Sequence, residues 1–360
     1  MKWGFNFELG PFETWDAIGL KESVVKMERD GFEVPENIRA MIAAGRSAFY
    51  RSDNGTVSFY DFAAEDYREL KVSPNIISLK AHKGAGKVIS DIPSATLVDL
   101  GDGVACLEFH TKMNALNAEI LDFMAQALDH VDANGAGLVI GNQAGGMPGA
   151  FSAGADLKGM LGAVKEKRFD DIDKMVRDLQ TVLQRAKYAP FPVVAAPFGL
   201  TLGGGCEVCL AVDRIVGHAE LYMGLVEIGV GLLPAGGGCL NLWRRYIQTI
   251  PASVSDVDLG RFFIPVFMTI AMAKVSTSAA DARANGFLGA GDRIVFNRDY
   301  LVGEAKKEVL KMVDEGYAPP VKRKIRIFGE SAQGMIAAEI YNMYKGGFIS
   351  DYDADRKSVV

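Results

Sequence analysis

From about residue 96 onward, apolar residues follow two alternating spacings along the chain. Short apolar runs predict buried strands at 96–100, 104–110, 137–141 and 192–196. Between these runs, apolar positions recur every three to four residues over 115–131 and 169–186, which predicts amphipathic helices. Buried strands that alternate with helices are typical of an α/β architecture. The pattern therefore predicts an α/β core.

The segment before this core has a different pattern. Residues 1–50 favour helices, with apolar stripes at 18–29 and 35–44. Large aromatic residues, Trp3, Phe5, Phe7, Phe12 and Trp15, crowd its first fifteen positions. A segment this short needs a partner surface to bury them.

Polar, turn-rich sequence joins that segment to the core, and Asn54-Gly55 within it suits a two-residue hairpin turn. Beyond the core, residues 300–315 and 331–344 predict amphipathic helices, whereas 349–360 is polar and carries no helix stop. We therefore expect four parts. They are a helical segment at 1–50, a linker with some strand at 51–94, the core at 95–300 and C-terminal helices at 301–360.

Composition and charge narrow the class of protein. With 49% hydrophobic and 23% charged residues the chain is ordinary globular material, and its net charge of -6 argues against nucleic acid as the main partner. Membrane spans need about 20 apolar residues, and no run here reaches that length. The first ten residues lack a signal-peptide pattern. We expect no nucleic-acid partner, no membrane partner and a cytoplasmic location.

The cysteines raise the question of a metal or redox site. Cys206 and Cys209 form a C-x-x-C pair, but no second pair with zinc spacing follows and the four histidines are scattered. We expect no metal, and buried apolar thiols instead.

The segment Ala150-Phe-Ser-Ala-Gly-Ala-Asp-Leu157 combines small residues with a helix-capping residue. Small side chains let a ligand approach the backbone, and Asp156 suits the N-cap of a helix that starts at Leu157. The N–H groups at such a helix start suit an anion or a developing oxyanion. Many tight turns before helices share this pattern, so both interpretations stay open here.

A second segment, Gly199-Leu-Thr-Leu-Gly-Gly-Gly-Cys-Glu207, follows a strand and precedes a helix expected at 207–212. Consecutive glycines cost backbone entropy, so they indicate N–H groups exposed at a helix start rather than packing alone. Glu227 follows among apolar residues, where desolvation raises the proton affinity of a carboxyl and makes it useful near neutral pH. Taken alone, each glutamate also fits a surface salt bridge.

Together these segments resemble the enoyl-CoA hydratase/isomerase (crotonase) superfamily. The matching elements are Lys112-Met-Asn-Ala-Leu116, Phe151-Ser-Ala-Gly-Ala-Asp-Leu157, Gly203-Gly-Gly-Cys-Glu207, and Glu227 followed by Leu233-Pro-Ala-Gly-Gly-Gly238. They occur in the family's order and spacing over about residues 95–300. The resemblance implies an α/β fold, a crotonase-type ββα spiral with helical N- and C-terminal appendages.

The resemblance also implies a role for each matching residue. The N–H groups of Ala155 and Gly204 would form an oxyanion hole for a thioester carbonyl. Glu207 and Glu227 would hold a water, with Glu207 activating it and Glu227 protonating C2. Family isomerases often keep one of these glutamates, so the pair favours an enoyl-CoA hydratase. The residues expected to lie along coenzyme A are Lys112, Ala115, Ala153, Asp156 and Leu157, and Lys112 fits a solvated loop lysine equally well.

The N-terminal segment resembles the last helical portion of 3-hydroxyacyl-CoA dehydrogenases, which precede a crotonase domain in some fusion proteins. We expect the chain to be the C-terminal part of such a bifunctional β-oxidation protein, with a dehydrogenase module as a partner. No dinucleotide-binding glycine pattern follows a strand, so we expect no cofactor beyond the coenzyme A of the substrate. The family commonly forms trimers or pairs of trimers, which implies a homo-oligomer.

Several alternatives stay open. The chain could be an enoyl-CoA isomerase, a non-catalytic acyl-CoA-binding or scaffold module, or a 3-hydroxyacyl-CoA hydrolase. The basic stretch 322–326 is either a solvated surface segment or a contact to the phosphates of coenzyme A. The Met- and Phe-rich residues 262–272 either shape the acyl pocket or belong to the core.

Overall fold

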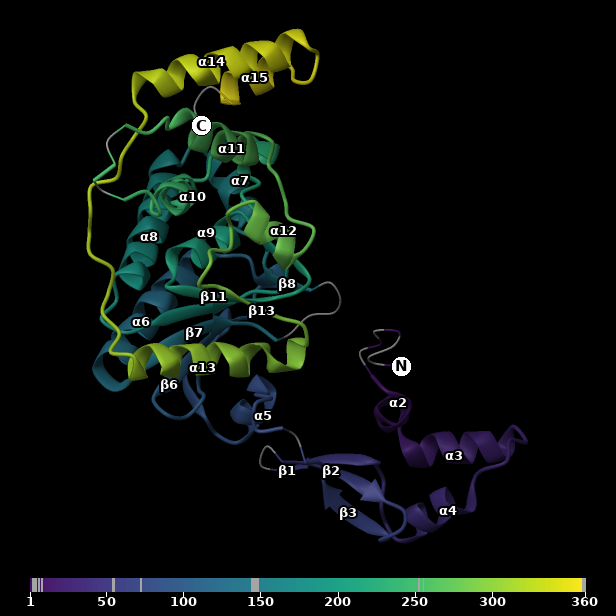
Figure 1. Ribbon diagram of the computed structural model, residues 1–360. Coiled ribbons are helices and arrows are strands. Elements are labelled where there is room, and N and C mark those ends of the chain that lie inside the picture. The colour runs from purple at the N-terminus through teal and green to yellow at the C-terminus, as the bar shows by residue number, and fades with distance from the viewer. Residues whose placement is uncertain are drawn as a thin grey trace. The chain divides into compact units, whose positions relative to one another are not determined.

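The computed structural model describes the chain except residues 2–4, 6, 8, 54–55, 72, 144–148, 252, 255 and 358–360. Its contacts divide the chain into two units (Figure 1). The first unit comprises residues 1–74 and 78–87, and the second comprises 75–77 and 88–360. The predicted division into four parts stays a prediction.

The first unit packs short helices with a small antiparallel sheet. Its elements are α2 (Pro11–Ile18), α3 (Leu20–Arg29), α4 (Glu36–Ala43), β1 (Tyr50–Asp53), β2 (Thr56–Asp61), β3 (Asp66–Glu69) and α5 (Leu79–Gly84). Asp53 lies opposite Thr56 in the register of β1 and β2, as the predicted hairpin requires. Its turn, Asn54-Gly55, lies outside the described residues, as does Trp3.

Aromatic side chains form much of the core of this unit. The ring of Phe49 lies 4.6 Å from that of Phe12 and 5.4 Å from that of Trp15. Phe49 therefore supplies part of the partner surface expected for Trp15, whereas Phe12 stays exposed despite this contact. Phe5 and Phe7 stay exposed.

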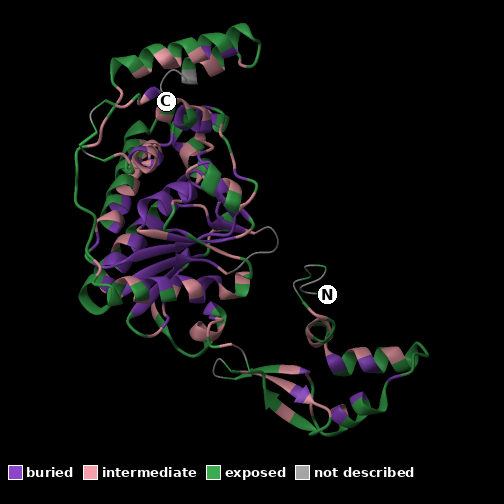
Figure 2. Cartoon of the chain, in the orientation of Figure 1, coloured by how far each residue is buried: buried purple, intermediate pink, exposed green. Residues whose placement is uncertain are grey.

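The core of the second unit is a seven-stranded sheet in the order β13-β11-β9-β7-β6-β5-β4. Its strands are β4 (Val88–Ile92), β5 (Ala95–Asp99), β6 (Val104–Phe109), β7 (Gly137–Gly141), β9 (Val193–Ala196), β11 (Arg214–His218) and β13 (Arg293–Val295). β4, β5 and β6 pair antiparallel, and the others pair parallel. Its central strands are buried throughout, which confirms the interpretation of the apolar runs (Figure 2).

A smaller parallel sheet, β12-β10-β8, lies beside it in the chain's second unit. It consists of β8 (Ala150–Ser152), β10 (Gly199–Leu202) and β12 (Leu221–Gly224). Each strand of this small sheet leads into a segment that carries candidate site residues.

Helices surround the two sheets. They are α6 (Ala118–Asn134), α7 (Leu157–Lys165), α8 (Phe169–Lys187), α9 (Gly204–Ala211), α10 (Gly238–Ile247), α11 (Gly260–Ala271), α12 (Ala279–Ala284), α13 (Leu301–Asp314), α14 (Glu330–Lys345) and α15 (Asp351–Lys357), with the 3₁₀ turns η1 (Lys112–Asn114), η2 (Glu227–Val230) and η3 (Arg298–Tyr300). α13 packs on β7, β9 and β11, while α14 packs on α11 (Figure 1).

Two predicted helix starts are wrong, each for a local reason. The helix expected from Ala115 begins at Ala118, because the side chain of Asn117 accepts a hydrogen bond from Ile120 N–H and caps it there. The helix expected from Glu207 begins at Gly204, so the glycines form its first turn. The polar stretch 349–360, for which no helix was predicted, contains α15.

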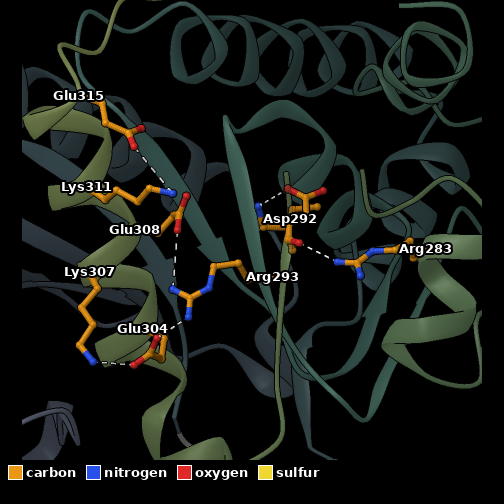
Figure 3. A network of polar contacts seen from close by, with 9 residues as sticks. Arg283, Asp292, Arg293, Glu304, Lys307, Glu308, Lys311 and Glu315 are labelled. Carbon is orange, nitrogen blue, oxygen red and sulfur yellow. Dashed lines mark hydrogen bonds and ion pairs between the residues drawn. The ribbon is translucent and has the colours of Figure 1, made fainter. Parts of the chain in front are cut away.

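Charged side chains fasten α13 to the edge of the sheet. Arg293 of β13 lies 2.7 Å from Glu304 and 3.7 Å from the buried Glu308, both on α13 (Figure 3). Next to it in the chain, Asp292 accepts hydrogen bonds from Ile215 N–H and from Arg245. The contacts of Arg293 therefore join β13 to α13, and those of Asp292 join the residue before β13 to β11 and α10.

None of the helices in the described part of the chain is both long enough and apolar enough to cross a membrane.

Candidate active site

The small sheet brings the two glycine-rich segments side by side. β8 and β10 pair parallel, with Ser152 opposite Thr201, so the turns that follow both strands meet at the same end of the sheet. Gly154 has a φ of +98°, and a Cβ placed on it would lie 2.9 Å from the Leu202 carbonyl oxygen and 3.2 Å from the Gly204 nitrogen. Only glycine fits there, because both its conformation and the close approach of the second turn exclude a side chain.

The backbone brings the N–H groups of Ala155 and Gly204, the predicted oxyanion donors, close together. Ala155 forms a parallel bridge with Leu116, in which Leu116 bonds to the Gly154 carbonyl and to Asp156 N–H. The N–H of Ala155 therefore points away from Leu116. Gly204 is the first residue of α9, so its N–H has no acceptor within the helix. A Cβ on Gly204 would lie 3.5 Å from Ala155 N, which shows how close the two residues are.

Glu207 lies one turn into α9 and is only 2% exposed. Its Oε1 accepts a 2.8 Å hydrogen bond from the N–H of Gly238, the first residue of α10. A Cβ on Gly236 would lie 2.5 Å from the other carboxylate oxygen. Burial raises the pKa of Glu207 to about 6, although the N–H groups of Gly238, Gly236 and Gly237 oppose that rise. Gly236, Gly237 and Gly238, here called the cradle of Glu207, therefore fit closely around this carboxylate.

Glu227 approaches the same turn from the 3₁₀ turn η2 after β12. Its Oε1 would lie 3.2 Å from a Cβ on Gly203, the residue before α9. Its Oε2 is buried and has no hydrogen-bond partner among the described residues. Burial, with the charge of Glu207 as a second cause, raises the pKa of Glu227 to about 8.

The two carboxyl groups therefore differ in their proton affinity. Near pH 7, the pair favours a state in which Glu207 is ionised and Glu227 carries a proton. Such a pair can accept a proton at one atom and donate one at another, next to two N–H donors. This is the arrangement needed for acid/base chemistry beside a developing oxyanion.

The remaining predicted residues lie on the segments next to the first of these turns. Ala153 and Ala115 are half-buried, and Ala153 N–H donates to the Met113 carbonyl, so their two segments run side by side. Asp156 caps α7 through the N–H groups of Lys158 and Gly159, as predicted, and Leu157 is 47% exposed at the start of that helix. Lys112 lies exposed on η1. The structure places all five in one region but assigns no ligand to any of them.

Sequence reasoning missed the structural part played by Gly236, Gly237 and Gly238. The glycine triplet was visible as a motif, but its partner, Glu207, lies 31 residues away from Gly238 in the chain. The cysteines of the C-x-x-C pair are both buried in α9. Among the described residues, no three metal-ligating side chains cluster.

Comparison with known proteins shows what the core of the second unit is similar to. The family model for enoyl-CoA hydratase/isomerase matches residues 99–253. An enoyl-CoA hydratase structure from Bacillus anthracis shares the fold with a TM-score of 0.50 and 21% identity, over 73% of this chain and 87% of that chain. The match over residues 99–253 and the shared fold support the enoyl-CoA hydratase/isomerase (crotonase) superfamily for this core, and the predicted α/β crotonase-type fold with helical termini is confirmed.

One of two relatives in sequence extends the match beyond the core. A Bacillus subtilis (strain 168) protein named a probable 3-hydroxyacyl-CoA dehydrogenase is 42% identical over 353 residues, which are 98% of this chain and 43% of that protein. The mitochondrial methylglutaconyl-CoA hydratase of Mus musculus is 34% identical over 133 residues, 36% of this chain and 40% of that protein. The chain spans less than half the length of these relatives. The predicted resemblance to a 3-hydroxyacyl-CoA dehydrogenase is confirmed by the match to the Bacillus subtilis protein, which covers both units of this chain.

Proposed function

We propose that this chain is an enoyl-CoA hydratase, which adds water to a 2-trans-enoyl-CoA to give a 3-hydroxyacyl-CoA in fatty-acid β-oxidation. The observation that carries this proposal is the convergence of Glu207 and Glu227 on the glycine turn that also presents the N–H of Gly204. Retention of both carboxyls, with unequal proton affinities, favours hydration over isomerisation.

Binding begins with the thioester. Its carbonyl oxygen accepts hydrogen bonds from Ala155 and Gly204, and these donors stabilise the enolate oxygen that develops as C3 is attacked. Coenzyme A lies along Ala115, Ala153, Asp156 and Leu157, and the exposed ammonium of Lys112 pairs with one of its phosphates. The oxyanion donors belong to backbone that is fixed by the fit of Gly154 against Gly204, so they need little reorganisation during reaction.

The two carboxyl groups then exchange protons with water and with C2. Ionised Glu207 takes a proton from the water while the water oxygen bonds to C3. The electron pair of the double bond moves into the thioester enolate. Protonated Glu227 donates its proton to C2 on the same face as the enolate collapses. Passage of a proton from Glu207 to Glu227 restores the starting pair, so the net change is addition of one water.

The test is incubation of the full chain with crotonyl-CoA in deuterium oxide, followed by mass spectrometry and NMR of the product. Hydration predicts 3-hydroxybutyryl-CoA with a single deuterium at C2, on one prochiral face. Absence of this product under conditions where crotonyl-CoA binds would contradict the proposal.

The same preparation separates the rival reactions. An isomerase converts trans-3-hexenoyl-CoA to the 2-enoyl isomer without gain of oxygen, and a hydrolase releases free coenzyme A thiol. A non-catalytic binding module would bind crotonyl-CoA without change and would tolerate Gln at both 207 and 227.

A further inference from the structure

Two neighbouring side chains of α8 contact the segment that holds the carboxylate of Glu207. The Nε2 of Gln180 donates a 2.7 Å hydrogen bond to the carbonyl oxygen of Ala235, the residue before the cradle. A Cβ placed on Gly236, the next residue, would lie 2.6 Å from Cδ2 of Leu179 and 2.5 Å from Oε2 of Glu207. One turn of α8 and the carboxylate therefore meet at the same part of the cradle.

The segment that leads into the cradle is irregular, whereas α8 is a long helix. Residues 232–237, all of them described, form loop and turn before α10 begins at Gly238. The 19-residue α8 packs on α9, which is the helix that carries Glu207. Because α8 contacts both α9 and the start of the cradle, it can fix the position of the cradle relative to the carboxylate.

The position of the cradle matters for the chemistry of Glu207. Burial raises the pKa of this carboxyl, and the N–H groups of the cradle oppose that rise. Hydrogen bonds weaken steeply when their geometry departs from the optimum, so a small displacement of the cradle changes both the proton affinity and the direction of the carboxylate. Gln180 is exposed and donates to backbone rather than to the carboxylate, so it acts on Glu207 only through the cradle.

We propose that Gln180 is a positioning residue for the reaction, because its hydrogen bond to Ala235 holds the cradle where it donates to Glu207. The inference rests on the proposed function for the role of Glu207 as the base. A glutamine amide suits this task, since it is a donor that stays neutral and adds no charge near the carboxyl. It bonds to a carbonyl oxygen, so the N–H groups of the cradle stay available for Glu207.

The test follows the ionisation of Glu207 directly and needs no substrate. The full chain, labelled with ¹³C at the glutamate carboxyls, would be titrated by NMR in the Glu227→Gln background, so that Glu207 ionises without its coupled neighbour. The signal of Glu207 is the one that Glu207→Gln removes. Gln180→Met has a side chain of similar length without an N–H donor, and we expect it to raise the midpoint of the titration by about 0.5 pH unit.

Two further variants separate positioning from general packing. The Nε of an arginine is as many bonds from the backbone as the Nε2 of glutamine, so Gln180→Arg restores the midpoint in about 0.5 M salt, which screens its exposed charge. Gln184→Met makes the same change as Gln180→Met one turn along α8, at an exposed position, and leaves the midpoint unchanged. A midpoint that Gln180→Met does not move would overturn the inference, even if that variant is less stable.

Kinetics then relates this inference to the proposed function. With Glu227 intact, Gln180→Met lowers kcat/KM for crotonyl-CoA about threefold more at pH 5 than at pH 7.5, because the acid limb of the profile moves with the base. A raised midpoint in a chain that does not hydrate crotonyl-CoA would support the position of Gln180 and contradict the hydratase. Hydration with an unmoved midpoint would overturn the role of Gln180 alone.

Discussion

Glu207 and Glu227 meet at one turn, but the structure supports them in different ways. Glu207 lies inside a regular helix, and the start of α10 donates a hydrogen bond to its carboxylate. Glu227 lies on a 3₁₀ turn, with one carboxyl oxygen buried and without a hydrogen-bond partner among the described residues. Hydrogen bonds to a carboxylate stabilise its charged form, and burial without them favours the neutral acid. This difference supports the proposed roles, with Glu207 as base and Glu227 as acid.

The start of α9 offers the largest expected effect short of removing a carboxyl. Gly204→Pro deletes the N–H proposed to bind the thioester oxygen, at a first helical position that tolerates proline. Gly204→Ala keeps that N–H and adds a Cβ in a similar place. We expect kcat for crotonyl-CoA to fall about 10²- to 10³-fold further in the proline variant than in the alanine variant. Equal rates for the two would show that this N–H is not an oxyanion donor.

The cradle of Glu207 can be disturbed without touching Glu227. A methyl group on Gly236 would lie 2.5 Å from Oε2 of Glu207 and 2.6 Å from Leu179, so the carboxylate must move. Misplacement of a catalytic group by about 1 Å can cost 10²-fold in rate, and we expect a loss of about that size in Gly236→Ala. Gly162→Ala is the matched control, because a Cβ there meets open space in α7. Full activity in Gly236→Ala would contradict the claim that these glycines position the carboxylate of Glu207 for reaction.

The different supports also predict the pH dependence of the rate. A base with a pKa of about 6 must be ionised and an acid with a pKa of about 8 must be protonated. The kcat/KM for crotonyl-CoA should therefore be bell-shaped, falling about tenfold per pH unit below and above that window. These limbs belong to the coupled pair rather than to either residue alone. A profile that stays flat from pH 7 to 9, after correction for spontaneous hydrolysis, would contradict the acid role.

The smallest effect is on stability. Because the folded-state pKa of Glu227 is raised above its ordinary value, the folded protein binds more protons than the unfolded chain between about pH 4.5 and 8. The contribution to stability is present below this window and is lost as the pH rises through it. Chemical denaturation should show Glu227→Gln more stable than the parent at pH 9, by on the order of 2 kcal/mol, and similar at pH 5. Glu330→Gln, at an exposed position, should show no such pH dependence.

Much of the fold followed from local sequence, because its central elements have a single clear period. The apolar run of β7 and the helical stripe of α8 are recognisable without any partner. β8, β10 and β12 were not, since each has only three or four residues and includes small or glycine residues with little strand preference. These strands form because distant segments pair in parallel, and the sequence of each segment alone does not reveal its pairing partner.

The candidate site divides in the same way. Asp156 was predicted as a cap because capping depends on residues two or three positions away. The close fit of Gly154 against Gly204, and of Gly236 against Glu207, depends on contacts across the fold. The glycines were visible in the sequence, but the atoms that require them to be glycine were not.

The most direct test of the account is absorbance at the enoyl-thioester band with crotonyl-CoA, comparing the parent chain with Glu207→Gln and Glu227→Gln. The account predicts that absorbance falls in the parent as 3-hydroxybutyryl-CoA forms, and that either change slows this by about 10²- to 10⁴-fold while crotonyl-CoA still binds. A variant that retains the parent rate, or a parent that binds crotonyl-CoA without change in absorbance, would contradict the shared acid/base role of the two glutamates.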